Sequence, residues 1–462
     1  MASHRSTSHR ARALALVVVV LMAASACGNS STGSSASEGG PSGGSAPPGG
    51  ADGVNDEGPV ENSSPGVTDD EIRFASFGTR ANNPLGTCLA DCFDAGVNAY
   101  FAWRNSEGGV HGRTLVLAEQ LDDQLAQNKE RALEVVSADD SFGAFSAPLL
   151  AMGFEDIAEA GIPLYTYAVD FTAMDGKPGI FGDRPVLCVI CTSRFFPYIA
   201  TLVDAKRIAS IGYGSVQAPK DCVNSIAASI ERYGDDTGQE VAYRNDELEF
   251  GLAKGIGPEV TAMKDAGVDL VMTCMDLNGV KTVEQEMERQ GMGAVPVLHN
   301  DSYDAAFIAD GDGLFEGDII QTSFRPFEAD AGTSQLATFK EWMDETGQPL
   351  TEIALQGWIN ADLAYRGIEA AGPSFTRASV IEATNELTDF TAGGLIPPID
   401  WSRQHEPWTD EDPITHGYAI ECRAFLRVKD SAFEMVGPPD KPFTCFDPES
   451  QDWTDPTFET FE

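Results

Sequence analysis

Residues 105–123 read NSEGGVHGRTLVLAEQLDD, and the rest of the fold can be inferred outward from this stretch. The pair Gly108-Gly109 closes an amphipathic helix that we expect over residues 94–105. Residues 113–121 then have the apolar pattern of a strand that ends in two aspartates. A second helix is expected over residues 128–137. A helix, a strand and a helix in immediate succession are typical of α/β proteins.

The same alternation continues along the chain, pauses around residues 176–191 and then restarts in a second series of similar size. Strands separated by helices of about ten residues imply parallel, doubly wound sheets. We therefore expect an α/β fold with two doubly wound parallel-sheet lobes. The expected strands are 71–78, 113–121, 142–146, 162–168, 207–213, 240–244, 268–273, 295–298 and 318–324, and the other expected helices are 153–160, 195–204, 221–233, 258–266 and 279–290.

The last third of the chain has a different pattern. Three helices are expected over residues 335–346, 353–371 and 378–386. Residues 418–429 and 432–436 then have the pattern of an antiparallel hairpin.

The N-terminal segment predicts export. Three arginines precede an apolar run over residues 13–24, which is too short to span a bilayer as a helix. The run ends in Ala24-Ser25-Ala26-Cys27-Gly28, small residues before a cysteine that resemble the lipobox of bacterial lipoproteins. In that class residues 1–26 are a signal peptide and Cys27 is lipidated; plain secretion after Ala26 is the alternative. Gly, Ser and Pro dominate residues 27–66, which we interpret as a disordered tether spanning about 35 Å.

The charge balance excludes one class of partner. The chain has 30 Lys+Arg and 72 Asp+Glu, a formal net charge of -42. The electric field of this negative charge repels nucleic acid and anionic lipid head groups, so no nucleic-acid partner is expected. No second long apolar segment follows the signal peptide.

Eight cysteines remain after Cys27, an even number that favours disulfides in an exported protein. Their spacing predicts the pairs Cys88 with Cys92, Cys188 with Cys191, Cys422 with Cys445, and by remainder Cys222 with Cys274. A redox motif at Cys188 and a zinc site are the less favoured alternatives.

Motifs for catalysis are missing from the sequence. It contains no HExxH, Walker loop or GxGxxG. The histidines after the signal, His111, His299, His405 and His416, are not spaced as metal pairs. We expect neither an enzyme nor a bound cofactor or metal.

Five short stretches, in order, resemble a known family. They are Val67-Thr68-Asp69-Asp70-Glu71-Ile72-Arg73, Asn105 to Arg113, Glu159-Ala160-Gly161-Ile162-Pro163, Asp265 to Val271, and Gln290-Gly291-Met292. Together they resemble the type I periplasmic binding proteins of the leucine/isoleucine/valine-binding family. The resemblance covers roughly residues 67–436. It implies two lobes joined by a three-segment hinge, with lobe one formed by 67–190 and 326–400 and lobe two by 191–325 and 401–462.

The resemblance also implies where a ligand binds. The cleft between the lobes lies at the carboxyl ends of the strands, where open α/β sheets place ligands. In lobe one this implicates Ser146, Ala147, Tyr167, Ala168 and Asp170. Family members with branched-chain ligands have Thr where this chain has Asp170, and a carboxylate there would oppose a ligand carboxylate; helix capping or a solvent-facing position is the alternative.

In lobe two the same resemblance implicates Tyr213, Asp276 and Asp301. Ordinary packing is the alternative for Tyr213. Asp301 falls at the acidic position that holds the ligand's amino group in the family, with a capping role as the alternative.

The expected function is therefore that of an extracytoplasmic solute-binding receptor of an ABC importer, closing on an amino acid or a related amide or carboxylate. Its expected partners are the small-molecule ligand, an ABC permease, and the outer face of the bacterial cytoplasmic membrane through the lipid anchor. We expect a monomer. The alternative is a ligand-sensing module that signals to a membrane receptor kinase.

Overall fold

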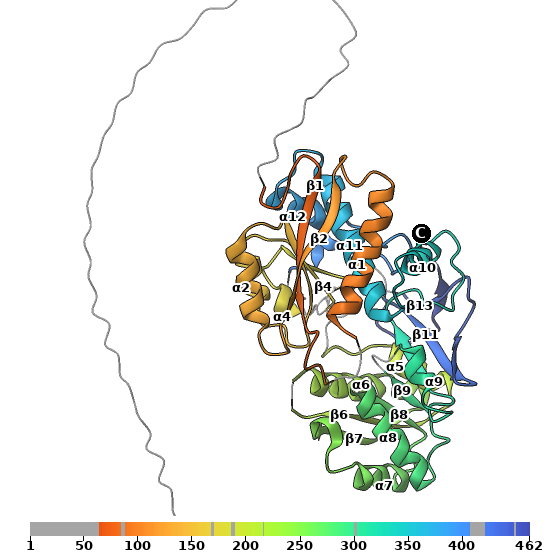
Figure 1. The fold of residues 1–462 in the computed structure, drawn as a ribbon. Helices are drawn as coiled ribbons and strands as arrows, with labels where there is room; N and C mark the ends of the chain where they lie inside the picture. The colour runs from red at the N-terminus through yellow and green to blue at the C-terminus, as the bar shows by residue number, and fades with distance from the viewer. Residues whose placement is uncertain are drawn as a thin grey trace, which may run out of the picture. The chain divides into compact units, whose positions relative to one another are not determined.

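The computed structural model describes residues 64–84, 88–167, 171–185, 190–215, 217–299, 303–406, 421–447 and 450–462. Their strands form two sheets, of five and nine strands (Figure 1). The first sheet has the order β2-β1-β3-β4-β5, and the second has the order β14-β13-β11-β10-β9-β8-β6-β7 with β12 paired to β11. The strands are β1 Glu71–Gly78, β2 Thr114–Asp122, β3 Gly143–Ala147, β4 Leu164–Thr166, β5 Ile180–Gly182, β6 Arg207–Tyr213, β7 Glu240–Leu248, β8 Leu270–Cys274, β9 Val297–His299, β10 Ile319–Thr322, β11 Glu421–Lys429, β12 Ala432–Met435, β13 Phe443–Phe446 and β14 Thr457–Glu459.

All neighbouring strands of the first sheet are parallel. Every residue of the inner strand β3 is buried, whereas the edge strand β2 keeps several residues accessible. A parallel strand with both faces covered needs a continuous apolar run, and GAFSA supplies one in β3. Figure 1 shows α1 (Ala90–Ser106) and α2 (Asn128–Ala138) on opposite sides of this sheet, which confirms the doubly wound arrangement.

The second sheet is parallel from β6 to β10 and antiparallel beyond β10. Its inner strand β8, LVMTC, is entirely buried, and its edge strand β7 is partly exposed. The predicted hairpin is confirmed, because β11 and β12 pair in antiparallel register. Strands β13 and β14, which were not predicted, extend the sheet further.

The helices complete the layers around the two sheets. Besides α1 and α2 they are α3 Phe154–Glu159, α4 Phe171–Met174, α5 Phe195–Leu202, α6 Gln217–Thr237, α7 Gly257–Asp265, α8 Leu277–Gln290, α9 Ala305–Ala309, α10 Leu336–Glu345, α11 Glu352–Ala371 and α12 Arg377–Asn385, with short 3-10 turns at Phe250–Leu252 and Trp401–Arg403. Helix α11 packs against α1, α12 and β4, so the helices after β10 return to the first sheet. None of the described helices is long and apolar enough to cross a membrane.

Two glycines allow α1 and α11 to approach closely. A Cβ at Gly96 would lie 1.8 Å from the Ala354 carbonyl oxygen, and one at Gly357 would lie 2.0 Å from that of Phe93. Any side chain at either position would collide with backbone of the facing helix. Beside this contact the indole rings of Trp103 and Trp358 stack, with centroids 5.4 Å apart and planes 7° apart.

Three disulfides join pairs of described residues, Cys88–Cys92, Cys222–Cys274 and Cys422–Cys445, and each is a pair that the cysteine spacing predicts. The Cys422–Cys445 bridge joins directly opposite residues of β11 and β13. The fourth predicted pair includes Cys188, which lies outside the described residues, as does the predicted lipidation site Cys27.

The turn at Trp401, in the segment 401–462 that the sequence assigned to lobe two, packs beside the first sheet. The Trp401 ring contacts the Phe181 ring of β5 at 5.3 Å between centroids. The turn Trp401–Arg403 also packs against α12. Trp401 is completely buried, so this segment belongs with the first sheet, and the chain returns to the second sheet only at β11.

Candidate functional site

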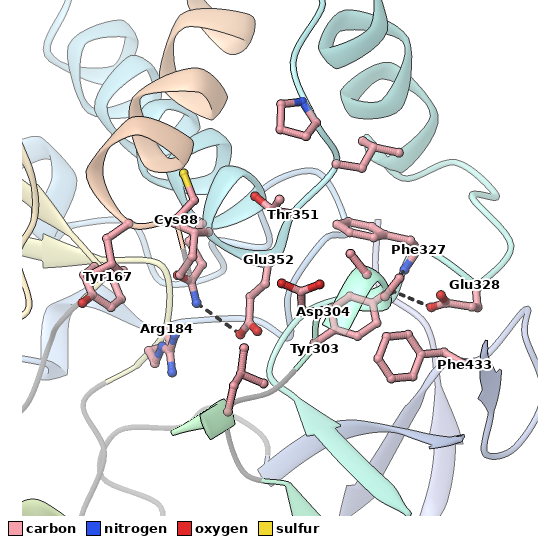
Figure 2. A pocket seen from close by; sticks show the side chains of 18 residues that line it. Cys88, Tyr167, Arg184, Tyr303, Asp304, Phe327, Glu328, Thr351, Glu352 and Phe433 are labelled. Atoms are coloured by element: carbon pink, nitrogen blue, oxygen red, sulfur yellow. Dashed lines mark hydrogen bonds between the residues drawn. The ribbon is translucent and has the colours of Figure 1, made fainter. Parts of the chain in front are cut away.

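A cavity of about 510 Å³ is lined by residues from both sheets and from the start of α11 (Figure 2). Most of its lining is apolar or aromatic, with a small set of charged and amide side chains. The lining residues are Cys88, Leu89, Tyr167, Arg184, Leu277, Tyr303, Asp304, Ala305, Ala306, Phe327, Glu328, Pro349, Leu350, Thr351, Glu352, Ile353, Gln356 and Phe433. This composition, with a few polar groups on an apolar wall, is typical of a small-molecule site.

The topology explains why these segments meet. Tyr167 directly follows β4, and Arg184 lies two residues after β5. Tyr303, Leu277 and Phe327 come shortly after strands β9, β8 and β10. The cavity is therefore at the carboxyl ends of parallel strands, the position that open α/β sheets give to their ligands.

Tyr303 is the centre of an aromatic wall. Its ring lies 5.2 Å from the Phe327 ring and 5.0 Å from the Phe433 ring. Its hydroxyl donates a 2.6 Å hydrogen bond to Glu328 and accepts a 2.7 Å bond from the Phe327 backbone N–H. Burial raises the pKa of Tyr303, and the neighbouring Glu328 carboxylate raises it further. Tyr303 therefore stays a neutral donor that holds Glu328 at the edge of the wall.

Two further carboxylates face the cavity from helix starts. Asp304 caps α9 and accepts a 2.9 Å hydrogen bond from the Phe307 N–H. Glu352 stands in the first turn of α11 and accepts a 3.4 Å bond from the Gln356 amide. In Figure 2 both carboxylates lie between Arg184 on one side and the aromatic wall on the other.

Arg184 is the one basic residue among the described residues of the lining. Its guanidinium is paired with Asp183, at 3.2 Å between Nη2 and Oδ2. The Asp183 side chain is 1% exposed, and its burial raises its pKa against the lowering effect of Arg184. The positive charge of Arg184 is thus already used to compensate a buried acid.

The residues expected in lobe one are only partly at this cavity. Tyr167 lines it, with its hydroxyl donating 2.7 Å to the Pro148 carbonyl. Ser146 and Ala147 do not line it. Ser146 is fully buried and donates a 2.8 Å hydrogen bond to the Phe77 carbonyl of β1, so its hydroxyl holds two strands together. Ala147 is buried against the end of β1, and its carbonyl accepts from the Thr79 N–H.

The residues expected in lobe two contact each other. The Tyr213 hydroxyl donates to Asp276 at 2.9 Å, and Asp276 also caps α8 by accepting from Asn278 and Gly279. Burial first, and Asp276 second, raise the pKa of Tyr213. Neither residue lines the cavity, but Leu277, next to Asp276, does. The expected residues Ala168, Asp170 and Asp301 lie outside the described residues.

Sequence reasoning missed Glu328, Glu352, Arg184 and Phe433. Glu328 follows the predicted strand 318–324. The expectation that ligands bind at the carboxyl ends of strands, which selected Tyr167, therefore also applied to Glu328. Glu352 comes from a helix start that reaches the site only through the packing of α11 on α1. No local pattern marked it.

One buried cluster has the composition of a metal site. Glu284, His299 and Asp318 are the only such group among the described residues, and all three are buried. Asp318 accepts a 2.7 Å hydrogen bond from the Val297 N–H, and its other carboxyl oxygen is hydrogen-bonded to His299 Nε2 at 2.8 Å. Burial lowers the pKa of His299 to about 3 and raises those of Asp318 and Glu284, and Asp318 raises that of Glu284 further. The raised pKa values of the two neighbouring carboxyls favour a proton between Glu284 and Asp318.

The comparisons with known proteins agree with this architecture. The sequence matches the periplasmic binding protein family over residues 87–423. No curated protein sequence matches the chain.

Solved structures show the same fold at low identity. A fatty acid ABC transporter substrate-binding protein from Thermomonospora curvata is 18% identical, with 85% of this chain and 95% of that one covered and a TM-score of 0.62. A solute-binding protein from R. palustris in complex with 4-hydroxybenzoate is 17% identical, with 79% and 96% covered and a TM-score of 0.60. An ABC transporter substrate-binding protein from Desulfitobacterium hafniense in complex with Leu is 17% identical, with 79% and 100% covered and a TM-score of 0.57.

The family match extends over well more than half of the chain, and the solved structures named above share its fold. The chain belongs to the periplasmic binding protein family, a class of receptors without enzymatic activity.

Proposed function

We propose that this protein is the extracytoplasmic solute-binding receptor of an ABC importer, which captures a small solute and delivers it to a membrane permease. The observation that carries the proposal is the cavity of about 510 Å³ at the carboxyl ends of strands from both sheets. A cavity of this volume fits a small organic molecule rather than a polymer. The solved relatives named above are ABC transporter components, which supports the same role here.

The membrane anchor and the lobe boundaries are part of the proposal. Lipidation at Cys27 would hold the domain at the outer face of the cytoplasmic membrane through the tether 27–66. Lobe one would consist of 67–190 with 326–406, and lobe two of the remaining folded segments. Replacing Cys27 with Ser should release the protein into the medium; a variant that stays membrane-bound would place the anchor elsewhere.

Ligand capture is tested with the aromatic wall. The probe is a solute that raises the melting temperature of the mature chain. The Phe433→Ala variant removes a ring from the cavity and should weaken the affinity for this solute by tenfold or more. Leu150→Ala is the matched control, because Leu150 is 44% exposed and does not line the cavity. Equal affinities for wild type and Phe433→Ala, measured by isothermal titration calorimetry, would move the ligand to another site.

A sensor that signals to a receptor kinase is the second candidate. Its binding region would have the same architecture, so the discriminating measurement is downstream. Deleting the gene should abolish uptake of the radiolabelled solute if the protein feeds a permease. Normal uptake with a lost transcriptional response would favour the sensor.

A further inference from the structure

The charges around the cavity are unbalanced. Three carboxylates line it, those of Asp304, Glu328 and Glu352, and the only basic side chain among the described lining residues is Arg184. Arg184 is paired with the buried Asp183. A ligand entering this space therefore meets an excess of negative charge in surroundings that are mostly apolar, where charge interactions are stronger than in water.

We propose that the ligand is an organic cation, an ammonium group on an apolar body, and that the cavity discriminates against carboxylates. The inference rests on the proposed receptor function and specifies the ligand class of the same cavity. It differs from what the names of the solved relatives print, which include fatty acid, 4-hydroxybenzoate and Leu, all bearing a carboxylate.

Among the described lining residues, a ligand carboxylate would find a cationic partner only in Arg184. Binding to Arg184 would compete with Asp183, whose charge is 1% exposed and would lose its compensation. The other usual anion site, a helix N-terminus, is also occupied. Thr351 caps α11 by accepting from the Ala354 N–H, and Glu352 brings its own negative charge to the first turn.

An ammonium would find partners on two sides. Glu352 and Asp304 offer carboxylate oxygens for charge-assisted hydrogen bonds. The rings of Tyr303, Phe327 and Phe433 offer π faces that attract cations and an apolar surface for the rest of the ligand. Lys340, which donates to the Phe327 carbonyl at 2.7 Å, does not line the cavity, and its charge acts on Glu328, whose pKa it lowers.

Glu328 fits the same interpretation. Its carboxylate is at the far edge of the aromatic wall, held by the Tyr303 hydroxyl at 2.6 Å. Burial raises its pKa, with Tyr303 and Lys340 acting in the opposite direction. A second cationic group on a longer ligand would be stabilised there, so diamines are expected to bind at least as tightly as monoamines of the same length.

The experiment uses two sets of molecules that share one skeleton and differ in charge. The first set is 3-methylbutylamine, leucinamide, leucine and 4-methylpentanoate; the second is 2-phenylethylamine, phenylalaninamide, phenylalanine and 3-phenylpropanoate. Affinities for the mature chain are measured by isothermal titration calorimetry at pH 7. Within each set the amine and the amide should bind at least tenfold more tightly than the zwitterion, and the carboxylate should bind most weakly.

A variant pair isolates the charge. Glu352→Gln keeps the shape of the side chain. It should weaken the affinity for the amines by tenfold or more and leave the affinity for the carboxylates unchanged or improved. Glu382→Gln, an exposed position on α12, makes the same change in net charge away from the cavity and should leave all affinities unchanged. Loss of affinity in both variants would assign the effect to overall charge and overturn the proposal.

The outcomes separate the ligand class from the receptor function. Tight binding of a zwitterion or carboxylate that Phe433→Ala abolishes would overturn the cationic ligand and leave the receptor function intact. Binding of none of the eight molecules would count against both. Tight binding of the amines that Glu352→Gln removes and Glu382→Gln does not would support both.

Discussion

The regions around the two sheets achieve stability in different ways. The first sheet is purely parallel, and its helices α1 and α11 are in backbone contact at Gly96 and Gly357. The second sheet continues into antiparallel strands, two disulfides close loops within it, and buried charges connect its layers. The first region also has a disulfide, Cys88–Cys92, and the ion pair Arg80–Asp94, but the second closes longer loops and buries its ion pair Arg194–Glu421 more completely. The cavity receives residues from both, so its geometry depends on both kinds of interaction.

The largest effect is expected from the buried ion pair Arg194–Glu421, which connects α5 to β11 at 2.6 Å with both side chains 3% exposed. Replacing Arg194 with Met leaves the Glu421 charge buried without its partner, and this should cost about 3–5 kcal/mol in the free energy of unfolding. Urea denaturation of the mature chain measures it.

Arg80→Met is the counterpart near the first sheet. Arg80 pairs with Asp94, but Asp94 also accepts a 2.6 Å hydrogen bond from Ser76, and burial already raises its pKa. In the variant Asp94 can take up a proton and lose its unpaired charge. The loss in the free energy of unfolding should therefore be smaller than for Arg194→Met. An Arg80→Met variant less stable than Arg194→Met would invert the proposed difference between the regions.

The disulfides should give the next largest difference. Cys222–Cys274 spans 52 residues and Cys88–Cys92 spans 4. In the chain-entropy description, removing the first should cost about 4 kcal/mol and removing the second about 2 kcal/mol. The Ala double variants, compared by denaturation under identical conditions, test the order. Equal losses would mean that strain or residual structure, rather than loop length, determines the contribution.

The smallest effect is a change in pH dependence. Burial holds the pKa of Glu284 well above its usual value, so its proton stabilises the fold below about pH 4.5, where the unfolded chain is also protonated, and this contribution is lost as the pH rises. Glu284→Gln keeps a donor to Asp318 without an ionisable group. Its stability relative to wild type should therefore increase between pH 4.5 and pH 7.5.

The control for this prediction is Glu286→Gln on the same helix. Hydrogen bonds from Arg289 hold the pKa of the partly buried Glu286 at about 2, so in the folded chain it carries no proton across this range. The stability of Glu286→Gln relative to wild type should therefore not rise between the two pH values, and should fall slightly as Glu286 of the unfolded wild-type chain loses its proton. A parallel rise in both variants would show a general charge effect.

Regular elements were predictable where burial and periodicity agree. β6 was predicted with its bounds, because RIASIGY is buried at all positions but the first. β13 and β14 were missed, since four- and three-residue strands in a Pro- and Asp-rich tail carry too little periodicity to recognise. The Cys422–Cys445 disulfide and pairing with β11 hold β13, and β14 pairs with β13, so both strands depend on tertiary contacts.

The site was predictable only to the level of strand ends. That rule selected Tyr167 and the neighbours of Tyr303 and Leu277. It also selected Ser146, whose side chain turns to β1 because both faces of β3 are buried. Glu352 could not be found this way, since its position depends on a helix contact between residues far apart in sequence.

The stacked indoles of Trp103 and Trp358 make the helix contact visible to spectroscopy. Two stacked chromophores 5.4 Å apart couple electronically and should give a near-ultraviolet circular-dichroism band that differs from the sum of the two separate indoles. Trp358 is completely buried and donates to Gln335, so external quenchers should not reach it in the folded chain. Because Glu352 begins the helix that carries Trp358, this band offers a label-free optical signal at the cavity wall during ligand titrations.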